Sequence, residues 1–161
     1  YTTRVGEGPF PTEFPSQLMA YIRERGEEYG ATTGRPRRCG WFDSLVARHS
    51  VLVNGLSRIV VMKLDVLDQL PEIKICVAYR FRGKRYHFFP SDVYVLEGAE
   101  PIYERHLGWQ ESTESVRRWR DLPVNAKKYL KRLESLLGVP ISVVSVGSER
   151  SQTIFIDERS K

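Results

Sequence analysis

Ser57-Arg58-Ile59-Val60-Val61-Met62-Lys63-Leu64-Asp65 is the stretch of sequence that decides the fold. Its centre is a continuous apolar, mostly β-branched run, which is typical of a strand buried on both faces. The run ends abruptly at Lys63 and Asp65. Because ligands of open α/β sheets lie at the carboxyl ends of strands, this stretch predicts both a buried strand and a site that follows it.

Further helices and strands are predicted on both sides of this stretch. Capping residues and apolar periodicity predict helices at 16–29, 43–54 and 123–137. Alternating or β-branched runs predict strands at 73–80, 86–89, 93–96, 141–145 and 153–156, the first two joined as a β-hairpin by Arg82-Gly83-Lys84. Residues 97–121 receive no assignment. The order helix, strand, hairpin, helix, strand predicts an α/β fold.

Length and composition set wide limits on function. The chain has 161 residues, 41% hydrophobic and 28% charged, which suits one well-buried domain. No apolar run approaches the roughly 20 residues of a membrane span, and no signal-peptide pattern opens the chain. The net charge of +5 fits nucleic acid, nucleotides or dicarboxylates equally well. Two cysteines, Cys39 and Cys76, make no disulfide framework and favour a reducing, cytoplasmic setting.

An arginine-rich loop, GATTGRPRRCGW at residues 30–41, follows the first predicted helix. Guanidinium groups match carboxylate and phosphate, so the loop predicts a small-anion site; a solvated basic turn is the alternative. Arg35 and Arg37 are two residues apart on a backbone that Pro36 restricts, so they are expected to point the same way. Arg38 is expected to face the other side, as a structural or a solvent-exposed residue, and Trp41 is expected to pack.

Two predicted strands end in groups suited to a purine. The Asp65 carboxylate could accept two hydrogen bonds from the N–H and amino edge of guanine, with the Lys63 stem along the base; a surface ion pair is the alternative. At residues 145–147, Ser-Val-Gly, backbone N–H groups could meet a base carbonyl, although such turns are common. Asp68 is interpreted as a charge at a helix N-terminus.

Catalytic and metal sites are not predicted. His49, His87 and His106 have no partners at metal-ligand spacing. Cys39, beside three arginines, could have a lowered pKa but has no histidine at hand. The chain also has no Gly-rich loop followed by lysine to hold a triphosphate.

These motifs resemble the C-terminal portion of adenylosuccinate synthetase. The resemblance covers essentially the whole chain, and the residues that carry it are Val5–Glu13, Gly30–Asp43, Lys63–Asp68, Cys76–Tyr79, Pro101–Tyr103, and Gly147 with Arg150. It implies a P-loop-related mixed α/β sheet domain with a β-hairpin, of which 1–161 is one segment. It also implies a GTP-dependent ligase of purine biosynthesis that joins IMP and L-aspartate with Mg²⁺, as a cytoplasmic homodimer.

The resemblance also implies site residues. Aspartate or IMP would contact Val5, Ala31, Thr32, Thr33, Gly34, Arg35, Pro36 and Arg37. GTP would contact Arg37, Lys63, Leu64, Asp65, Ser145, Val146 and Gly147. Met62 and Ser148 depart from the family's frequent threonine and proline.

The family's N-terminal phosphate loop, catalytic aspartate and catalytic histidine match nothing in the chain. We therefore expect a fragment that is inactive alone and needs the N-terminal half, where Mg²⁺ would also bind. Two alternatives stay open: a basic module for RNA or single-stranded nucleic acid, and a remnant that binds a nucleotide without turning it over. If the chain is a fragment of the synthetase, neither a membrane nor nucleic acid is expected as a partner.

Overall fold

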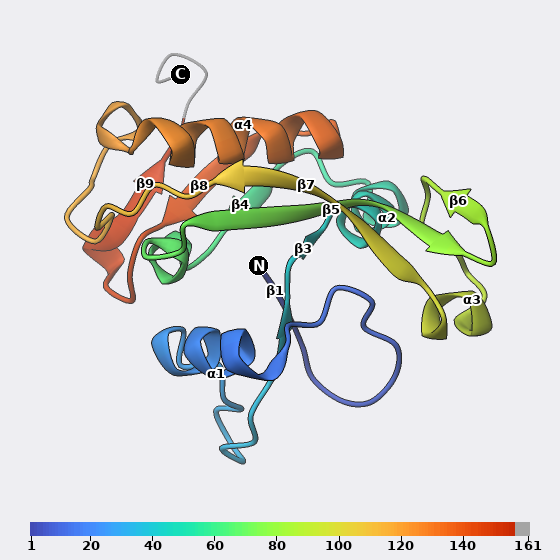
Figure 1. Ribbon diagram of the computed structural model, residues 1–161. Helices are drawn as coiled ribbons and strands as arrows, with labels where there is room; N and C mark the ends of the chain where they lie inside the picture. The colour runs from blue at the N-terminus through green and yellow to red at the C-terminus, as the bar shows by residue number, and fades with distance from the viewer. Residues whose placement is uncertain (157–161) are drawn as a thin grey trace. The chain divides into compact units, whose positions relative to one another are not determined.

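The computed structural model describes residues 1–156 and divides the chain into two compact units (Figure 1). One unit combines Tyr1–His49 with Lys74–Arg105, and the other combines Ser50–Ile73 with His106–Lys161. Each unit is built from two separate stretches of chain, so no single cut in the sequence separates them. That the chain is one segment of a larger domain remains a prediction.

The first unit holds a two-stranded and a four-stranded sheet. Its elements are β1 (Thr2–Arg4), α1 (Ser16–Arg25), β2 (Arg38–Gly40), β3 (Phe42–Asp43), the start of α2 (Ser44–Asn54), most of β5 (Glu72–Phe81), β6 (Lys84–Tyr86), α3 (Val93–Glu97) and most of β7 (Glu100–Leu107). β1 and β2 pair antiparallel, while β5 pairs with β3 in parallel, with β6 antiparallel, and with β7. The predicted hairpin is confirmed: Arg82 and Gly83 take φ of 48° and 76° between β5 and β6, the left-handed pair of a tight hairpin turn.

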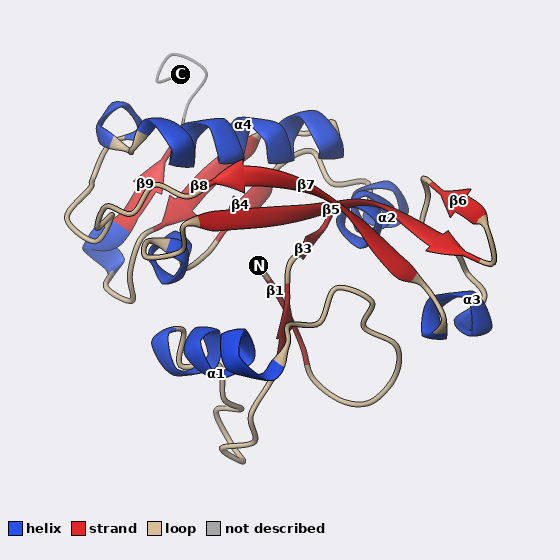
Figure 2. Ribbon diagram, viewed as in Figure 1, coloured by secondary structure: helices blue, strands red, loops and turns tan. Residues whose placement is uncertain are grey.

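The second unit combines a three-stranded sheet with the long helix α4, which is drawn at an angle to β8 and β9 in Figure 2. Its elements are β4 (Ile59–Val61), a 3₁₀ helix at Leu64–Leu67, a second at Trp119–Asp121, α4 (Val124–Leu137), β8 (Ile141–Ser145), a third 3₁₀ helix at Arg150–Gln152, and β9 (Thr153–Phe155). The strand order is β4-β8-β9, with β4 parallel and β9 antiparallel to β8. The predicted helix after Pro123 is confirmed: its buried face includes Tyr129, Leu130 and Leu133, and Gly138 ends it at φ 72°.

Four predictions of local structure were wrong. The returning strand of the hairpin spans Lys84–Tyr86 rather than 86–89. α1 ends at Arg25 rather than near residue 29, because Glu27 takes a left-handed φ of 47° and the Glu28 N–H reaches back to the Arg23 carbonyl, 2.9 Å away. Residues 93–97 form a helix instead of a strand, because the Asp92 carboxylate accepts a hydrogen bond from the Tyr94 N–H and caps it. Finally, β4 is not buried on both faces, since Val60 is 54% exposed at the edge of its sheet.

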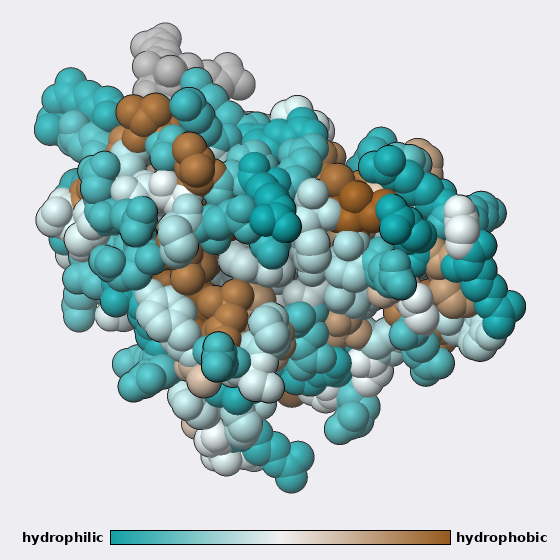
Figure 3. Space-filling model, viewed as in Figure 1, coloured by the Kyte–Doolittle hydropathy of each residue, from teal (hydrophilic) through white to brown (hydrophobic). Residues whose placement is uncertain are grey.

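One face of the molecule is mostly hydrophilic (Figure 3), and both cysteines are buried. On the face drawn in Figure 3, hydrophobic residues form small, separate groups on a mostly hydrophilic surface. Within residues 1–156, no helix combines the length and apolarity that crossing a membrane requires. Cys39 and Cys76 are both buried free thiols.

Candidate functional site

The arginine-rich loop folds as a short, closed hairpin in the first unit. The Gly30 N–H donates to the Arg35 carbonyl (2.8 Å), and the Gly34 N–H donates to the Gly30 carbonyl (2.8 Å). Lower in the loop, the Arg37 N–H donates to the Glu28 carbonyl at 2.9 Å. Gly34 has φ +64°, which favours glycine. Residues 31–36 are exposed at the tip, so a firmly held backbone presents polar side chains to solvent.

Arg35 and Arg37 lie in different environments. Arg35 is exposed at the tip, and its N–H lies 3.4 Å from the Thr33 hydroxyl. Arg37 Nη1 instead donates to Glu28 Oε2 at 2.8 Å, and the Glu28 side chain is only 4% exposed. The other oxygen of Glu28 accepts a hydrogen bond from the Tyr1 hydroxyl at 2.7 Å. Part of the Arg37 guanidinium therefore holds the loop, whereas the Arg35 side chain is presented outward.

The next two residues are structural, and for Arg38 this is one of the two alternatives that the sequence left open. Its guanidinium donates to both oxygens of Glu13 and to the Gly8 carbonyl, and this bidentate contact lowers the pKa of the Glu13 carboxyl. The prediction that Cys39 could have a lowered pKa was wrong, although Arg23 and Arg37 do act in that direction. Burial, with the Glu28 carboxylate nearby, raises the pKa of that thiol to about 11.

Val5 lies in a shaped loop that Arg4 braces. The Arg4 guanidinium donates to the Pro9 carbonyl (2.5 Å) and the Glu7 carbonyl (2.8 Å). Val5 itself is 81% exposed. The loop thus has fixed backbone geometry around an outward-facing residue, which is compatible with the backbone contact expected of Val5.

In the second unit, the two strand ends that were predicted to share a purine are neighbours. β4 and β8 are parallel, with Val61 opposite Val144, so Lys63 and Ser145 follow at the same sheet edge. The Lys63 N–H donates to the Ser145 hydroxyl at 2.8 Å. Lys63 takes φ 55°, and Lys63 and Asp65 are partly exposed while Leu64 is buried. The structure therefore brings these predicted residues together.

The turn after β8 differs in detail from the prediction. The Val146 N–H already donates to the Gln152 carbonyl at 2.9 Å, so it is engaged within the protein. A Cβ on Gly147 would lie 2.2 Å from the Gln152 side-chain oxygen. A larger residue at 147 would therefore have to displace the end of the Gln152 side chain.

Asp68 is a residue whose role the sequence interpretation missed. It is fully buried at the C-terminal end of the 3₁₀ helix, not a solvated charge at a helix N-terminus. Its carboxylate accepts hydrogen bonds from the Trp109 indole N–H (2.7 Å), the Thr113 N–H (2.7 Å) and the Thr113 hydroxyl (2.9 Å). Trp109 and Thr113 lie in the stretch 97–121, to which the sequence assigned no structure. Their indole N–H and hydroxyl groups were the only indication that this stretch could bind a carboxylate.

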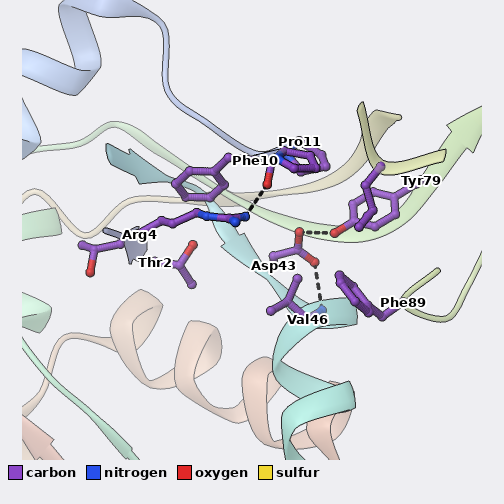
Figure 4. Close-up of a pocket in the computed structure, with 11 residues that line it drawn as sticks. Thr2, Arg4, Phe10, Pro11, Asp43, Val46, Tyr79 and Phe89 are labelled. Atoms are coloured by element: carbon purple, nitrogen blue, oxygen red, sulfur yellow. Dashed lines mark hydrogen bonds between the residues drawn. The ribbon is translucent and has the colours of Figure 1, made fainter. Parts of the chain in front are cut away.

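A cavity of about 260 Å³ lies within the first unit (Figure 4). At its wall the buried Asp43 carboxylate caps α2, as predicted, by accepting from the Leu45 and Val46 N–H groups. It also accepts a hydrogen bond from the Tyr79 hydroxyl, which the sequence did not indicate. Burial raises the pKa of the Asp43 carboxyl against the opposing effect of these hydrogen bonds.

The described residues contain no group of three or more His, Cys, Asp and Glu side chains that could hold a metal ion. We therefore assign no residue between 1 and 156 to a metal.

The family model for adenylosuccinate synthetase matches residues 1–154. The chain belongs to this family. It is 51% identical over 156 residues to the adenylosuccinate synthetase of Magnetococcus marinus and 52% identical over 158 residues to that of Carboxydothermus hydrogenoformans. These alignments cover 97% and 98% of the chain but 36% and 37% of the relatives, so the chain spans about a third of their length.

A solved structure supports the fold. The fully ligated adenylosuccinate synthetase of Plasmodium falciparum matches with a TM-score of 0.92 and 40% identity, over 98% of this chain and 38% of that one. The predicted mixed α/β fold and the resemblance to this family are confirmed. These matches are to a GTP-dependent ligase family, and they give no support to the alternative of a nucleic-acid-binding module.

Proposed function

We propose that the chain is the C-terminal part of a complete adenylosuccinate synthetase, which joins IMP and L-aspartate at the expense of GTP in purine synthesis. In this proposal the chain supplies substrate and nucleotide recognition. The phosphate loop, the catalytic residues and the Mg²⁺ site belong to the other part of the complete enzyme. The complete enzyme is proposed to be a homodimer in the cytoplasm, a reducing setting that suits the two buried free thiols.

L-Aspartate is assigned to the tip of the arginine-rich loop. The observation that carries this assignment is the closed hairpin of residues 28–37, whose backbone bonds hold Thr32, Thr33 and Arg35 outward. A guanidinium pairs well with a carboxylate, and the hydroxyls can donate further hydrogen bonds. Ala31, Gly34 and Pro36 shape the same tip.

IMP is assigned to two parts of the first unit. Arg35 would also reach it, and the Val5 backbone would meet its ribose. Arg37 has one terminal nitrogen committed to Glu28, so its proposed contact toward GTP falls to the rest of the guanidinium.

Guanine is assigned to the shared end of β4 and β8. The Asp65 carboxylate would accept from the base N–H and amino group, while the Lys63 stem lies along the ring. Leu64 is buried between them and would hold the two side chains at their spacing. At the end of β8, with the Val146 N–H engaged, the proposed contact to the base falls to Gly147 and Ser145.

The experiment that tests this proposal uses the complete synthetase that carries this segment. Asp65→Asn should raise the KM for GTP about tenfold, a loss of one charge-assisted contact. ITP lacks the amino group, so its KM should change less and the preference for GTP over ITP should shrink. Asp121→Asn, at an exposed ion pair with Arg118, is the matched control. An unchanged preference in Asp65→Asn would refute the guanine assignment.

A further inference from the structure

The turn that carries Lys63 and Asp65 is held at both of its ends. At the start, the Lys63 N–H is bonded to the Ser145 hydroxyl. At the finish, the Asp68 N–H donates to the Asp65 carbonyl at 3.1 Å. The Asp68 carboxylate then reaches across to residues 109 and 113. Between these anchors the chain makes a single 3₁₀ turn.

The anchor at Asp68 is strong for so short an element. Its side chain is 0% exposed, and it accepts from an indole N–H, a backbone N–H and a hydroxyl, all within 3.0 Å. Thr113 is also fully buried, and Trp109 is 5% exposed. Hydrogen bonds to a charged acceptor are stronger than neutral ones, and inside a protein they strongly resist displacement.

We propose that Asp68 is a positioning residue for nucleotide recognition, which orients Asp65 by anchoring the 3₁₀ turn to Trp109 and Thr113. This inference rests on the proposed assignment of guanine to Lys63 and Asp65. Asp68 lies three residues after Asp65 and is bonded to its carbonyl through the backbone, so a shift of one moves the other. Contact geometry this close to a ligand is sensitive, since a displacement of about 1 Å can cost roughly a hundredfold in rate.

The hydrogen-bond partners of Asp68 require a carboxylate at this position. Three donors converge on its two oxygens, and the Thr113 hydroxyl lies within reach of both, at 2.9 and 3.2 Å. Asparagine has the same shape but would turn an NH₂ group toward at least one of these donors. Asp68→Asn therefore removes the anchor with little change in side-chain volume.

The test measures kinetics and stability of the complete synthetase carrying this segment. Asp68→Asn should raise the KM for GTP about tenfold and reduce the preference for GTP over ITP, with the KM for IMP and L-aspartate within about twofold. Thr113→Val, which removes only the hydroxyl donor, should show the same pattern more weakly. Thr113→Ser retains the donor and should behave as the unmodified enzyme.

The outcomes separate this inference from the one it rests on. If Asp68→Asn and Thr113→Val lower thermal stability but leave the GTP to ITP preference unchanged, Asp68 is only structural and the inference is wrong. If Asp68→Asn does not fold, the GTP to ITP preference of Thr113→Val is compared with that of Thr113→Ser. Equal preferences in these two variants would show that the inference is wrong. If Asp65→Asn itself leaves the preference unchanged, the guanine assignment fails first, whatever the Asp68 variants do.

Discussion

The Lys63 backbone N–H donates a 2.8 Å hydrogen bond to the Ser145 side-chain hydroxyl, 82 residues further along the chain. This bond joins the ends of two parallel strands, β4 and β8. Because Ser145 is 1% exposed, the bond is shielded from competing water. It makes the two strand ends one structural element, which can be tested by removing the hydroxyl.

Ser145→Ala should lower the free energy of unfolding by about 1 kcal/mol, because the Lys63 N–H loses its acceptor. In the complete synthetase it should also raise the KM for GTP. Ser142→Ala is the matched control on the same strand, since it removes a longer bond, 3.3 Å, to the Ile59 carbonyl. Chemical denaturation and GTP kinetics of both variants check the prediction, and equal effects from the two would contradict it.

Arg35→Leu should mainly impair the use of L-aspartate by the complete synthetase. One charge-assisted contact is worth about 1.5–3 kcal/mol, so the KM for aspartate should rise at least tenfold. Arg35→Lys keeps the charge but loses the planar arrangement of donors, so its KM for aspartate should lie between those of the unmodified enzyme and Arg35→Leu. Steady-state kinetics with aspartate varied provide the measurement. Unaltered aspartate kinetics in Arg35→Leu would show that the loop is wrongly assigned.

Arg37→Leu should differ from Arg35→Leu in stability. Arg37→Leu leaves the Glu28 carboxylate, whose side chain is 4% exposed, without its charged partner. The free energy of unfolding should fall by about 2 kcal/mol. This is less than for a fully buried ion pair, because the Arg37 side chain is one-third exposed. Arg35→Leu, at the exposed tip, should change stability by no more than about 0.5 kcal/mol. Equal unfolding free energies in the two variants would disprove the bracing role of Arg37.

The pH dependence of stability should have opposite signs at Asp43 and Glu13. Burial raises the pKa of Asp43 above its value in the unfolded chain, so the native state holds its proton longer. The stability of the protein relative to Asp43→Asn should therefore fall as pH rises from about 4 through the native pKa of Asp43.

Glu13 provides the internal comparison. The hydrogen bond from Arg38 lowers the pKa of the Glu13 carboxyl, so its contribution is present above the unfolded pKa and is lost as pH falls through the native one. Stability relative to Glu13→Gln should therefore rise over the acid range. Denaturation series between about pH 3 and pH 7 measure both slopes, and a shared sign would contradict the assignment of causes.

The isolated 161-residue chain should form no adenylosuccinate from IMP, L-aspartate and GTP. It spans about a third of its relatives, and its sequence has no Gly-rich loop followed by lysine to hold the triphosphate. Chromatographic detection of product provides the readout, with the complete synthetase as the positive control. Turnover by the chain alone would overturn our proposal for where the catalytic residues lie.

Much of the fold was readable from local patterns. The helix at Val124–Leu137 and the strand at Ile141–Ser145 follow from apolar periodicity and from Gly138 and Pro140 between them. Two of the errors arose where a single residue decides: the Asp92 side chain caps an apolar run as a helix, and the positive φ of Glu27 ends α1 early. Periodicity averages over several residues, so it does not register the conformation of one residue.

The candidate site divides in the same way. The sequence by itself determined which side chains are available, the arginine-rich loop and Lys63-x-Asp65, because these are contiguous motifs whose chemistry does not depend on distant partners. Only the tertiary structure decided that β4 and β8 are parallel neighbours, that Arg37 is committed in part to Glu28, and that Asp68 is buried against Trp109. The physical reason is that burial and hydrogen bonds between distant residues set the role of a charge, and neither exists until the chain has folded.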